Sequence, residues 1–286
     1  MSFSKMRLSH TIVKDCGTKD GKGGGIFVGK GTNLLMQNSH MSNCYANSGG
    51  ALNLEEGEHT IQNSVISKNY AEYEGGAIFA AENANLLILG SLFSNNFAPE
   101  GDGGSIFMDI ASNLKASNSV FSSNLAVRGG AIFFSRSTRG NFSTTHFKHN
   151  TADENGGGVS VEDNYGDRFQ FFNSSFSFNS ANIYGGGLSF TRAMAAVSSC
   201  TFANNAAALG GALAMVGQTR KQPVTLHIFK TKFLANKANN SRIGRGGGLY
   251  VAGNTKLKIK ECTEIKENVA LQGGALFATE IGRAHV

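Results

Sequence analysis

The sequence is poor in several residue types that most soluble domains use freely. Its 286 residues include no tryptophan and only two prolines, and 16% are charged, against about a quarter in an average soluble domain. The shortage of proline excludes a collagen-like helix, and a hydrophobic share of 41% is too high for a disordered chain. No apolar run approaches the ~18 residues of a membrane helix, and residues 1–10 contain no apolar signal-peptide core.

Glycine, by contrast, is abundant and recurs at regular intervals. A tetrad of two glycines, a small residue and an aliphatic residue occurs ten times, and its glycine pairs hold 20 of the 37 glycines. The tetrads lie at residues 23–26, 49–52, 75–78, 103–106, 129–132, 156–159, 185–188, 210–213, 246–249 and 273–276. Successive copies are 25 to 29 residues apart, with one longer interval of 36. This regularity indicates a repeat protein with a period near 27 residues.

The residues after each tetrad alternate with the period of a β-strand. The position two residues beyond the tetrad is apolar in every copy, as at Ala80 and Phe134, whereas the position between is mixed. An apolar row beside a variable row predicts strands with one buried face.

A second motif, Phe-x-x-Asn or Ile-x-x-Asn, precedes eight of the ten tetrads. Its asparagines are Asn69, Asn96, Asn124, Asn150, Asn179, Asn205, Asn236 and Asn268. Ile12 with Asp15 and Met41 with Cys44 are interpreted as degraded first copies. We expect the asparagines to form a structural ladder of hydrogen bonds and the aromatic rings to stack in the interior.

These rows predict an all-β fold, a right-handed parallel β-helix of about ten coils that forms a single domain over residues 1–279. Each repeat is expected to contain two or three short strands that pair with their counterparts about 4.8 Å away in the next coil. A β-propeller needs repeats of about 40 residues or more, and an ordinary β-sandwich does not repeat its sequence.

The alternation of Gly-Gly-Ala-Ile with Phe-x-x-Asn resembles the chlamydial polymorphic outer membrane proteins, and it is similar to the broader set of right-handed β-helix repeat proteins. The resemblance covers residues from about Ile12 to Ala278. It implies a passenger domain that acts as an adhesin, preceded by a secretion signal and followed by a membrane β-barrel. The implied location is extracellular, at the cell surface or outer membrane, with membrane association only through segments outside this sequence.

Both ends of the sequence are expected to be incomplete. Residues 280–286, EIGRAHV, match the translation of a common sequencing-adapter sequence, so we interpret them as an artefact tail. The chain also begins inside a partial coil, which predicts that a signal peptide lies upstream.

The mixed row beside the tetrads is the first candidate binding surface. Its aromatic members are Phe27, Phe79, Phe107, Phe133, Tyr250 and Phe277. An outward aromatic stripe is expected to bind a glycan or a surface protein. The alternative is that small neighbours such as Ala77 and Ala131 let these rings fold back and be shielded.

A basic segment is the second candidate. Residues 217–260 contain no aspartate or glutamate but ten cations, namely Arg220, Lys221, Lys230, Lys232, Lys237, Arg242, Arg245, Lys256, Lys258 and Lys260. Such a patch is expected to attract polyanions. The alternative is a solvated face that resists strand association. Specific nucleic-acid binding is not expected, because no known binding module is present.

The acidic residues near 153–167 do not form a recognisable catalytic set, so we predict a non-catalytic binding protein. The alternative is a polysaccharide lyase or hydrolase of the pectin-lyase-like class, in which paired carboxylates do the chemistry. No cofactor or metal is expected, because no Cys/His spacing fits zinc. Cys16 and Cys44 are about one coil apart, which is compatible with a disulfide or with two stacked thiols.

Overall fold

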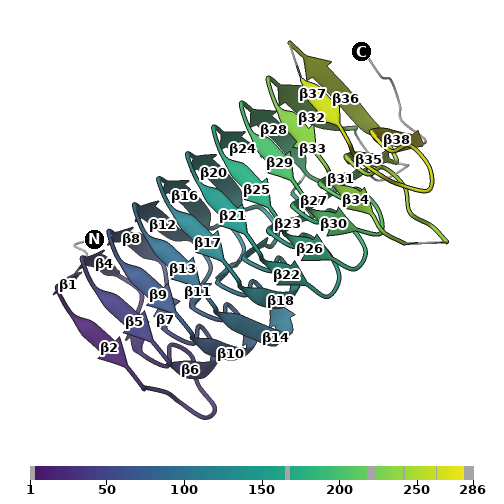
Figure 1. The fold of residues 1–286 in the computed structure, drawn as a ribbon. Helices are drawn as coiled ribbons and strands as arrows, with labels where there is room; N and C mark the ends of the chain where they lie inside the picture. Colours follow the sequence, from purple (N-terminus) through teal and green to yellow (C-terminus); the bar gives the residue numbers. More distant parts are fainter. Residues whose placement is uncertain (1–3, 165–167, 218–222, 241, 262, 280–286) are drawn as a thin grey trace.

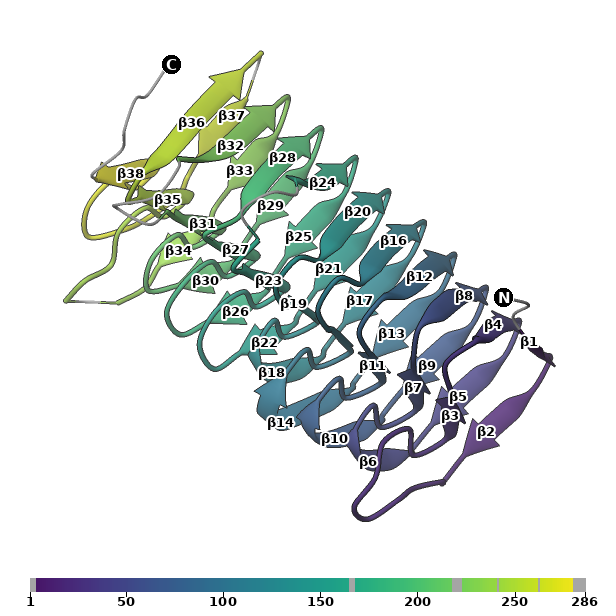
Figure 2. The ribbon, with the colours of Figure 1, turned by 180° about the vertical axis from the view of Figure 1, so that it is seen from behind.

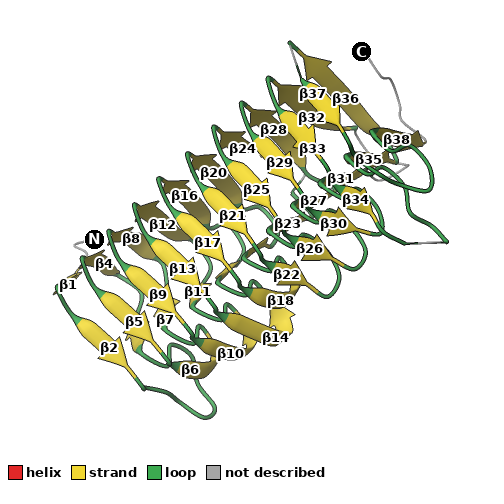
Figure 3. Cartoon of the chain, in the orientation of Figure 1, coloured by secondary structure: helices red, strands yellow, loops and turns green. Residues whose placement is uncertain are grey.

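The computed structural model describes residues 4–164, 168–217, 223–240, 242–261 and 263–279, and every regular element in them is a β-strand. The strands form four parallel sheets that run side by side along one long axis (Figure 1; Figure 3). Within those residues no helix is long and apolar enough to cross a membrane.

Sheets A and B each contain ten strands. Sheet A consists of β1 (Ser4–Ser9), β4 (Thr32–Gln37), β8 (Gly57–Gln62), β12 (Ala84–Leu89), β16 (Asn113–Ser117), β20 (Arg139–Ser143), β24 (Arg168–Phe172), β28 (Met194–Ser198), β32 (Val224–Phe229) and β36 (Thr255–Lys260). Sheet B consists of β2 (Ile12–Lys14), β5 (His40–Ser42), β9 (Val65–Ser67), β13 (Leu92–Ser94), β17 (Val120–Ser122), β21 (His146–Lys148), β25 (Ser175–Ser177), β29 (Thr201–Ala203), β33 (Lys232–Leu234) and β37 (Glu264–Lys266).

Sheets C and D complete each coil. Sheet C has eight strands, β6 (Tyr45–Ser48), β10 (Tyr70–Glu74), β14 (Phe97–Asp102), β18 (Leu125–Arg128), β22 (Thr151–Ala152), β26 (Ser180–Ala181), β30 (Ala206–Ala207) and β34 (Lys237–Ala238). Sheet D has ten, β3 (Ile26–Val28), β7 (Leu52–Leu54), β11 (Ile78–Ala80), β15 (Ile106–Met108), β19 (Ile132–Phe134), β23 (Val159–Glu162), β27 (Leu188–Thr191), β31 (Leu213–Val216), β35 (Leu249–Ala252) and β38 (Leu276–Thr279).

The chain visits the sheets in the order A, B, C, D and then begins the next coil (Figure 2). Each strand pairs in parallel with the same strand of the neighbouring coil, as β13 does with β9 and β17. Every tetrad ends at the first residue of a sheet D strand. The predicted parallel β-helix of about ten coils is therefore confirmed.

The corners between sheets A, B and C explain why asparagine is common beside the motifs. In each coil the corner residue has a positive φ, which asparagine adopts at lower cost than most residues. Between sheets A and B, the corner is Asn38, Asn63, Asn118 or Asn173 in four of the coils, with φ between 46° and 50°. One such residue turns the chain without a loop, so the inward rows stay in register.

The interior contains the predicted aromatic stack. The motif phenylalanines from Phe93 to Phe233 are fully buried, and their rings lie 4.7 to 5.1 Å from those of the next coil. The assignment of Ile12 and Asp15 as the first motif copy was wrong by one residue. Val13 pairs with Met41, which makes Val13 and Cys16 the stacked positions, and Ile12 points outward with 71% of its surface exposed.

The predicted asparagine ladder is confirmed from Asn69 to Asn268. From Asn96 onward, each side-chain oxygen accepts hydrogen bonds from the backbone N–H and the side-chain amide of the preceding ladder asparagine. Each amide also donates to a backbone carbonyl of the preceding coil, as Asn150 Nδ2 does to Phe121 O at 3.0 Å. The ladder therefore satisfies the backbone at the B–C corner, where strand pairing is interrupted.

A second buried ladder, which was not among the sequence-based predictions, lies at the A–B corner. There a hydroxyl accepts the backbone N–H of the preceding coil, as in Ser39 N–H to Ser64 Oγ and Ser64 N–H to Ser91 Oγ, both at 3.1 Å. Cys200 occupies the same row between Ser174 and Thr231. Burial raises the pKa of its thiol to about 11. The signal was a serine or threonine two residues before every motif phenylalanine or its equivalent except Phe202, which Cys200 precedes.

Cys16 and Cys44 are neighbours in adjacent coils, and both are free thiols. They stand where the later coils have ladder asparagines, and Cys44 N–H donates to Asn69 Oδ1 at 3.0 Å. Burial raises the pKa of the Cys44 thiol. Of the two readings of this pair, the structure shows the stacked thiols. Cys262 and residues 280–286 lie outside the described residues.

Candidate functional site

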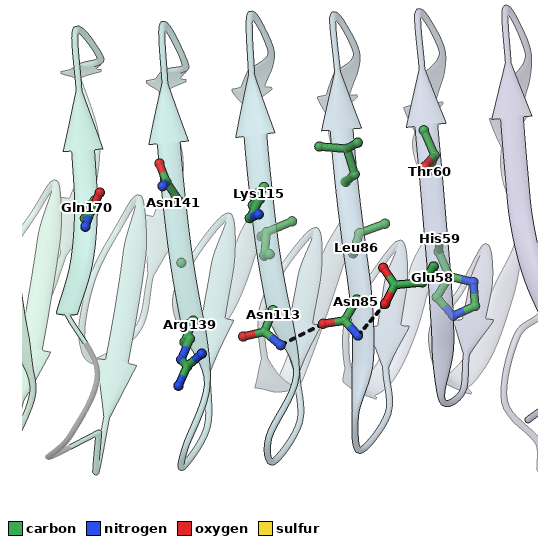
Figure 4. Close-up of a pocket in the computed structure, with 13 residues that line it drawn as sticks. Glu58, His59, Thr60, Asn85, Leu86, Asn113, Lys115, Arg139, Asn141 and Gln170 are labelled. Carbon is green, nitrogen blue, oxygen red and sulfur yellow. Dashed lines mark hydrogen bonds between the residues drawn. The ribbon is translucent and has the colours of Figure 1, made fainter.

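The outer face of sheet A carries a groove of about 570 Å³ that crosses five coils. Its lining residues come from β8, β12, β16, β20 and β24 (Figure 4). They are Glu58, His59, Thr60, Asn85, Leu86, Leu87, Asn113, Leu114, Lys115, Arg139, Gly140, Asn141 and Gln170. Side chains alternate along each strand, so every second residue faces the groove and those between face the core. This surface is called the sheet A groove below.

A row of hydrogen-bonded side chains follows one side of the sheet A groove (Figure 4). Asn85 Nδ2 donates to Glu58 Oε1 at 3.0 Å, and Asn113 Nδ2 donates to Asn85 Oδ1 at 2.7 Å. Arg139 is the register partner of Asn113 in the next coil. The row thus presents an ordered series of carboxylate, amide, amide and guanidinium groups along the axis of the molecule.

The charge on this face is almost entirely positive. The strands of sheet A contain one carboxylate, that of Glu58. The exposed cations on the same strands are Lys5, Arg7, Lys115, Arg139, Lys256, Lys258 and Lys260. Charges of one sign on one face sum into a field that attracts ligands of the opposite sign. The aspartates and glutamates of the chain lie mainly in the corners and in the turns beside sheets C and D.

His59 lies beneath the groove and faces the core, with 1% of its surface exposed. The backbone N–H of Leu34 can only donate, so His59 Nδ1 accepts it at 3.3 Å, and Nε2 must then carry the proton toward Glu55 O at 2.7 Å. Burial lowers the pKa of His59, because the charged ring loses its hydration.

Acid is expected to weaken the fold through His59. The lowered pKa means that the folded state binds a proton less readily than the unfolded state, so this contribution is complete above pH 6.5 and is lost as the pH falls toward the folded-state pKa. When urea unfolding is measured between pH 7.5 and 5, the His59→Gln variant should lose less stability than the wild-type protein, because glutamine keeps a hydrogen-bond acceptor but does not titrate. Identical pH profiles for the two proteins would contradict this assignment.

A comparison with known families agrees with this architecture. A family model described as a right handed beta helix region matches residues 6–187. The chain belongs to the right-handed β-helix family. No curated protein and no solved structure shows significant similarity to it.

The aromatic row beside the tetrads is not an exposed stripe of this β-helix, so that prediction was wrong for most of its members. Phe79, Phe133 and Tyr250 are only 4 to 7% exposed, and Phe107 and Phe277 are partly buried. Phe27 alone in the row is largely exposed, at 54%.

The alternative, that these rings are shielded, holds, and in three coils the residue before the glycine pair is a cation that folds over a ring on the outer face of sheet D. Lys22 Nζ lies 4.0 Å from the centre of the Phe79 ring, and the guanidinium of Arg128 lies 4.7 Å from that of Phe133. Arg245 covers Phe277 in the same way, at 5.0 Å. The rings also stack on one another, as Phe79 does on Phe107 with centres 5.5 Å apart.

The predicted basic segment does not form one face of the β-helix. Lys256, Lys258 and Lys260 lie on β36 of sheet A, whereas Lys232 lies on sheet B and Lys237 on sheet C. Lys230 is at the A–B corner, Arg242 and Arg245 are in the turn before sheet D, and Arg220 and Lys221 lie outside the described residues.

Two of these cations are also paired with carboxylates of the next coil. Lys230 Nζ lies 3.8 Å from Glu261 Oε2, and Lys232 Nζ lies 3.7 Å from Glu264 Oε2. Residues that follow the segment in sequence thus partly neutralise it in space. The positive face is set by sheet A and not by a stretch of sequence.

Three acidic residues of the middle coils form ion pairs with arginines along sheets C and D. Arg128 binds Asp102 through two hydrogen bonds, at 2.7 and 3.0 Å, and reaches Glu162 at 2.6 Å. Arg192 pairs with Asp163. Burial raises the pKa of Glu162 in spite of Arg128. In the described part of the chain no three His, Cys, Asp or Glu side chains are grouped as metal ligands, and Asp167 lies outside that part.

Proposed function

We propose that this protein is a non-catalytic binding protein whose sheet A groove holds a linear acidic glycan. The observation that carries the proposal is the excess of cations on the outer face of sheet A around an ordered row of amides. Its resemblance to polymorphic outer membrane proteins supports a role as an adhesin at a cell surface or in the extracellular space.

The repeat of the fold suits a linear polymer. Equivalent side chains of neighbouring coils are about 4.8 Å apart, so a chain that follows the axis meets a polar side chain of the same row at each coil. Amides such as Asn113 and Asn141 can donate and accept hydrogen bonds with hydroxyl groups. Lys115 and Arg139 lie where they can pair with carboxylates or sulfates of the ligand, and Arg139 can do so through two N–H groups.

The absence of a carboxylate pair favours binding over hydrolysis. Glycoside hydrolysis uses two carboxyl groups on either side of the scissile bond. Among the described residues that line the sheet A groove, Glu58 is the only carboxylate, and Asn85 already donates to it. The alternative of a polysaccharide lyase or hydrolase therefore predicts a product that the proposed function does not.

The double substitution Lys115→Gln and Arg139→Gln is expected to weaken binding of polygalacturonate or heparin about tenfold at low salt, because it removes two cations from the groove. The affinity of the wild-type protein and that of the double variant should both fall as the salt concentration is raised. Surface plasmon resonance with immobilised glycan measures this, and dextran serves as the uncharged reference.

A matched control is the double substitution Lys19→Gln and Lys68→Gln, which removes the same charge from exposed positions outside sheet A. Equal losses in the two double variants would mean that net charge and not the groove drives binding. Release of unsaturated or reducing ends during incubation with the glycans would instead establish the enzyme alternative.

A further inference from the structure

An exposed strip of aromatic side chains lies on the outer face of sheet C. Tyr45, Tyr70 and Phe97 occupy the first position of β6, β10 and β14, and Tyr70 pairs in register with both of the others. Their exposed fractions are 52, 45 and 41%, unlike the shielded rings of sheet D. Leu125 continues the same row in the next coil. Contiguous exposed apolar groups of this kind mark binding surfaces, and we call these three rings the aromatic strip.

The N-terminal end of the aromatic strip rests on a glycine. In the first coil the row continues at Gly17, which is bridged to Tyr45. A Cβ atom at Gly17 would lie only 2.2 Å from Cε1 of Tyr45, so the ring lies against the backbone there. This support gives one ring of the strip a fixed place while leaving half of its surface exposed.

Two of the rings have a carboxylate close behind them in the chain. Glu72 follows Tyr70, and Glu100 follows Phe97, in the two coils where sheet C has extra residues and its register shifts. The Tyr73 hydroxyl donates to Glu72, which raises the pKa of Tyr73. In the described part of the chain no lysine or arginine lies within ion-pair distance of Glu72 or Glu100.

The nearby carboxylates are engaged differently. Ser48 Oγ donates to Glu74 Oε2 at 2.8 Å, and Arg128 binds Asp102. The exposed Lys68 lies at the B–C corner two residues before Tyr70. Glu72 and Glu100 thus have no cationic partner among the described residues, although Glu72 accepts the Tyr73 hydroxyl, so each can still pair with a cation of an external partner.

We propose that the aromatic strip docks a lysine- or arginine-containing segment of a partner protein. A ring attracts a cation through its face, and a carboxylate beside it adds an ion pair with a charge-assisted hydrogen bond. The protein uses the first of these contacts internally, where Lys22 covers Phe79. The strip repeats the combination of ring and carboxylate in two successive coils, which suits two cationic side chains of one segment.

Tyrosine fluorescence provides a direct readout. The chain has no tryptophan and six tyrosines, and Tyr45, Tyr70 and Tyr73 belong to the strip or to its border. Titration with a blocked decapeptide of alternating lysine and glycine should change the tyrosine emission in a saturable way, and salt should weaken the binding. The matched peptide of alternating glutamate and glycine should give no saturable change. No change with the lysine peptide would overturn the proposal.

Two pairs of variants separate docking at the strip from general attraction. Glu72→Gln with Glu100→Gln should weaken binding about tenfold, whereas Glu56→Gln with Glu82→Gln, exposed carboxylates in turns that follow sheet D, should not. Phe97→Ser should weaken it as well, and Phe172→Ser, which removes an even more exposed ring on sheet A, should not.

Equal effects within either pair would overturn the proposal. Sedimentation of the protein without peptide tests the other occupant of the strip. Self-association that Phe97→Ser abolishes would show that a second copy of the chain fills the strip, and it would also overturn the assignment of a cationic partner segment.

Discussion

Replacing Asn205 by alanine is expected to lower the free energy of unfolding by about 4 kcal/mol, because several buried hydrogen-bonding groups lose their partners at once. The Asn205 amide donates to Phe176 O and to Asn236 Oδ1, both at 2.9 Å. Its side-chain oxygen accepts both the backbone N–H and the side-chain amide of Asn179, at 3.0 Å. Asn205 is 0% exposed, so water cannot replace these bonds.

Asn204 provides the matched control, because it is the same residue type one position earlier. It is exposed at the B–C corner and has a φ of 56°. Asn204→Ala should cost about 1 kcal/mol, the penalty for alanine in the left-handed region. Urea unfolding followed by circular dichroism measures both variants. Similar losses for the two would mean that the ladder adds little beyond turn conformation.

The sequence was sufficient to predict the interior because the fold repeats one environment in every coil. The positions equivalent to Phe147 or Asn150 have similar neighbours in the coils before and after them, so the same residue type is favoured in coil after coil. The rows therefore stand out without any structure, and the stack and the ladder follow from them. The hydroxyl row that includes Ser64 and Ser91 also recurs in register. Serine and threonine are common elsewhere in the chain, so this recurrence does not stand out in the sequence.

Exposure outside the core was not predictable from the rows, because it depends on what folds over them. Phe79 has the sequence environment of an outward residue, yet Lys22, two coils away, covers its ring. The residue before a glycine pair varies from lysine to tyrosine to leucine. No recurring residue type therefore predicted that a side chain at this position covers a ring. Phe27 has the same place in its strand and remains exposed.

The prediction that residues 217–260 form one basic patch was wrong for a related reason. Residues 217–260 are rich in cations in sequence, but a coil of this length passes through all four sheets and distributes them around the axis. The face of sheet A instead gathers cations from distant coils, such as Lys5, Lys115 and Lys256. Only the register of the coils shows that these residues share one surface. The aromatic strip was not predicted from the sequence, because aromatic residues occupy its row in three coils only.

Replacing Gly130 by alanine is expected to destabilise the protein by about 3 kcal/mol or more, because the new methyl group has no space between the coils. A Cβ atom at Gly130 would lie 2.3 Å from Gly157 O and 2.4 Å from Thr151 O. Both atoms are backbone of the next coil, to which Gly130 is joined by the hydrogen bond from its N–H to Gly156 O at 3.0 Å. Relief of the overlap requires the coils to separate, which breaks hydrogen bonds on both sides.

Gly29→Ala isolates this cross-coil contact from the general effect of removing a glycine. A Cβ atom at Gly29 would meet only Phe27 Cε1, at an ordinary distance of 3.8 Å, and neither Gly29 nor Gly130 has a positive φ. Alanine reduces the conformational freedom of the unfolded chain at both sites, which favours folding by about 0.4–1 kcal/mol where the native backbone accepts it. The two substitutions should therefore shift the urea midpoint in opposite directions. A stabilised or unchanged Gly130→Ala protein would show that the glycine pairs are needed for turn conformation at their first residue and not for close packing of the coils at their second.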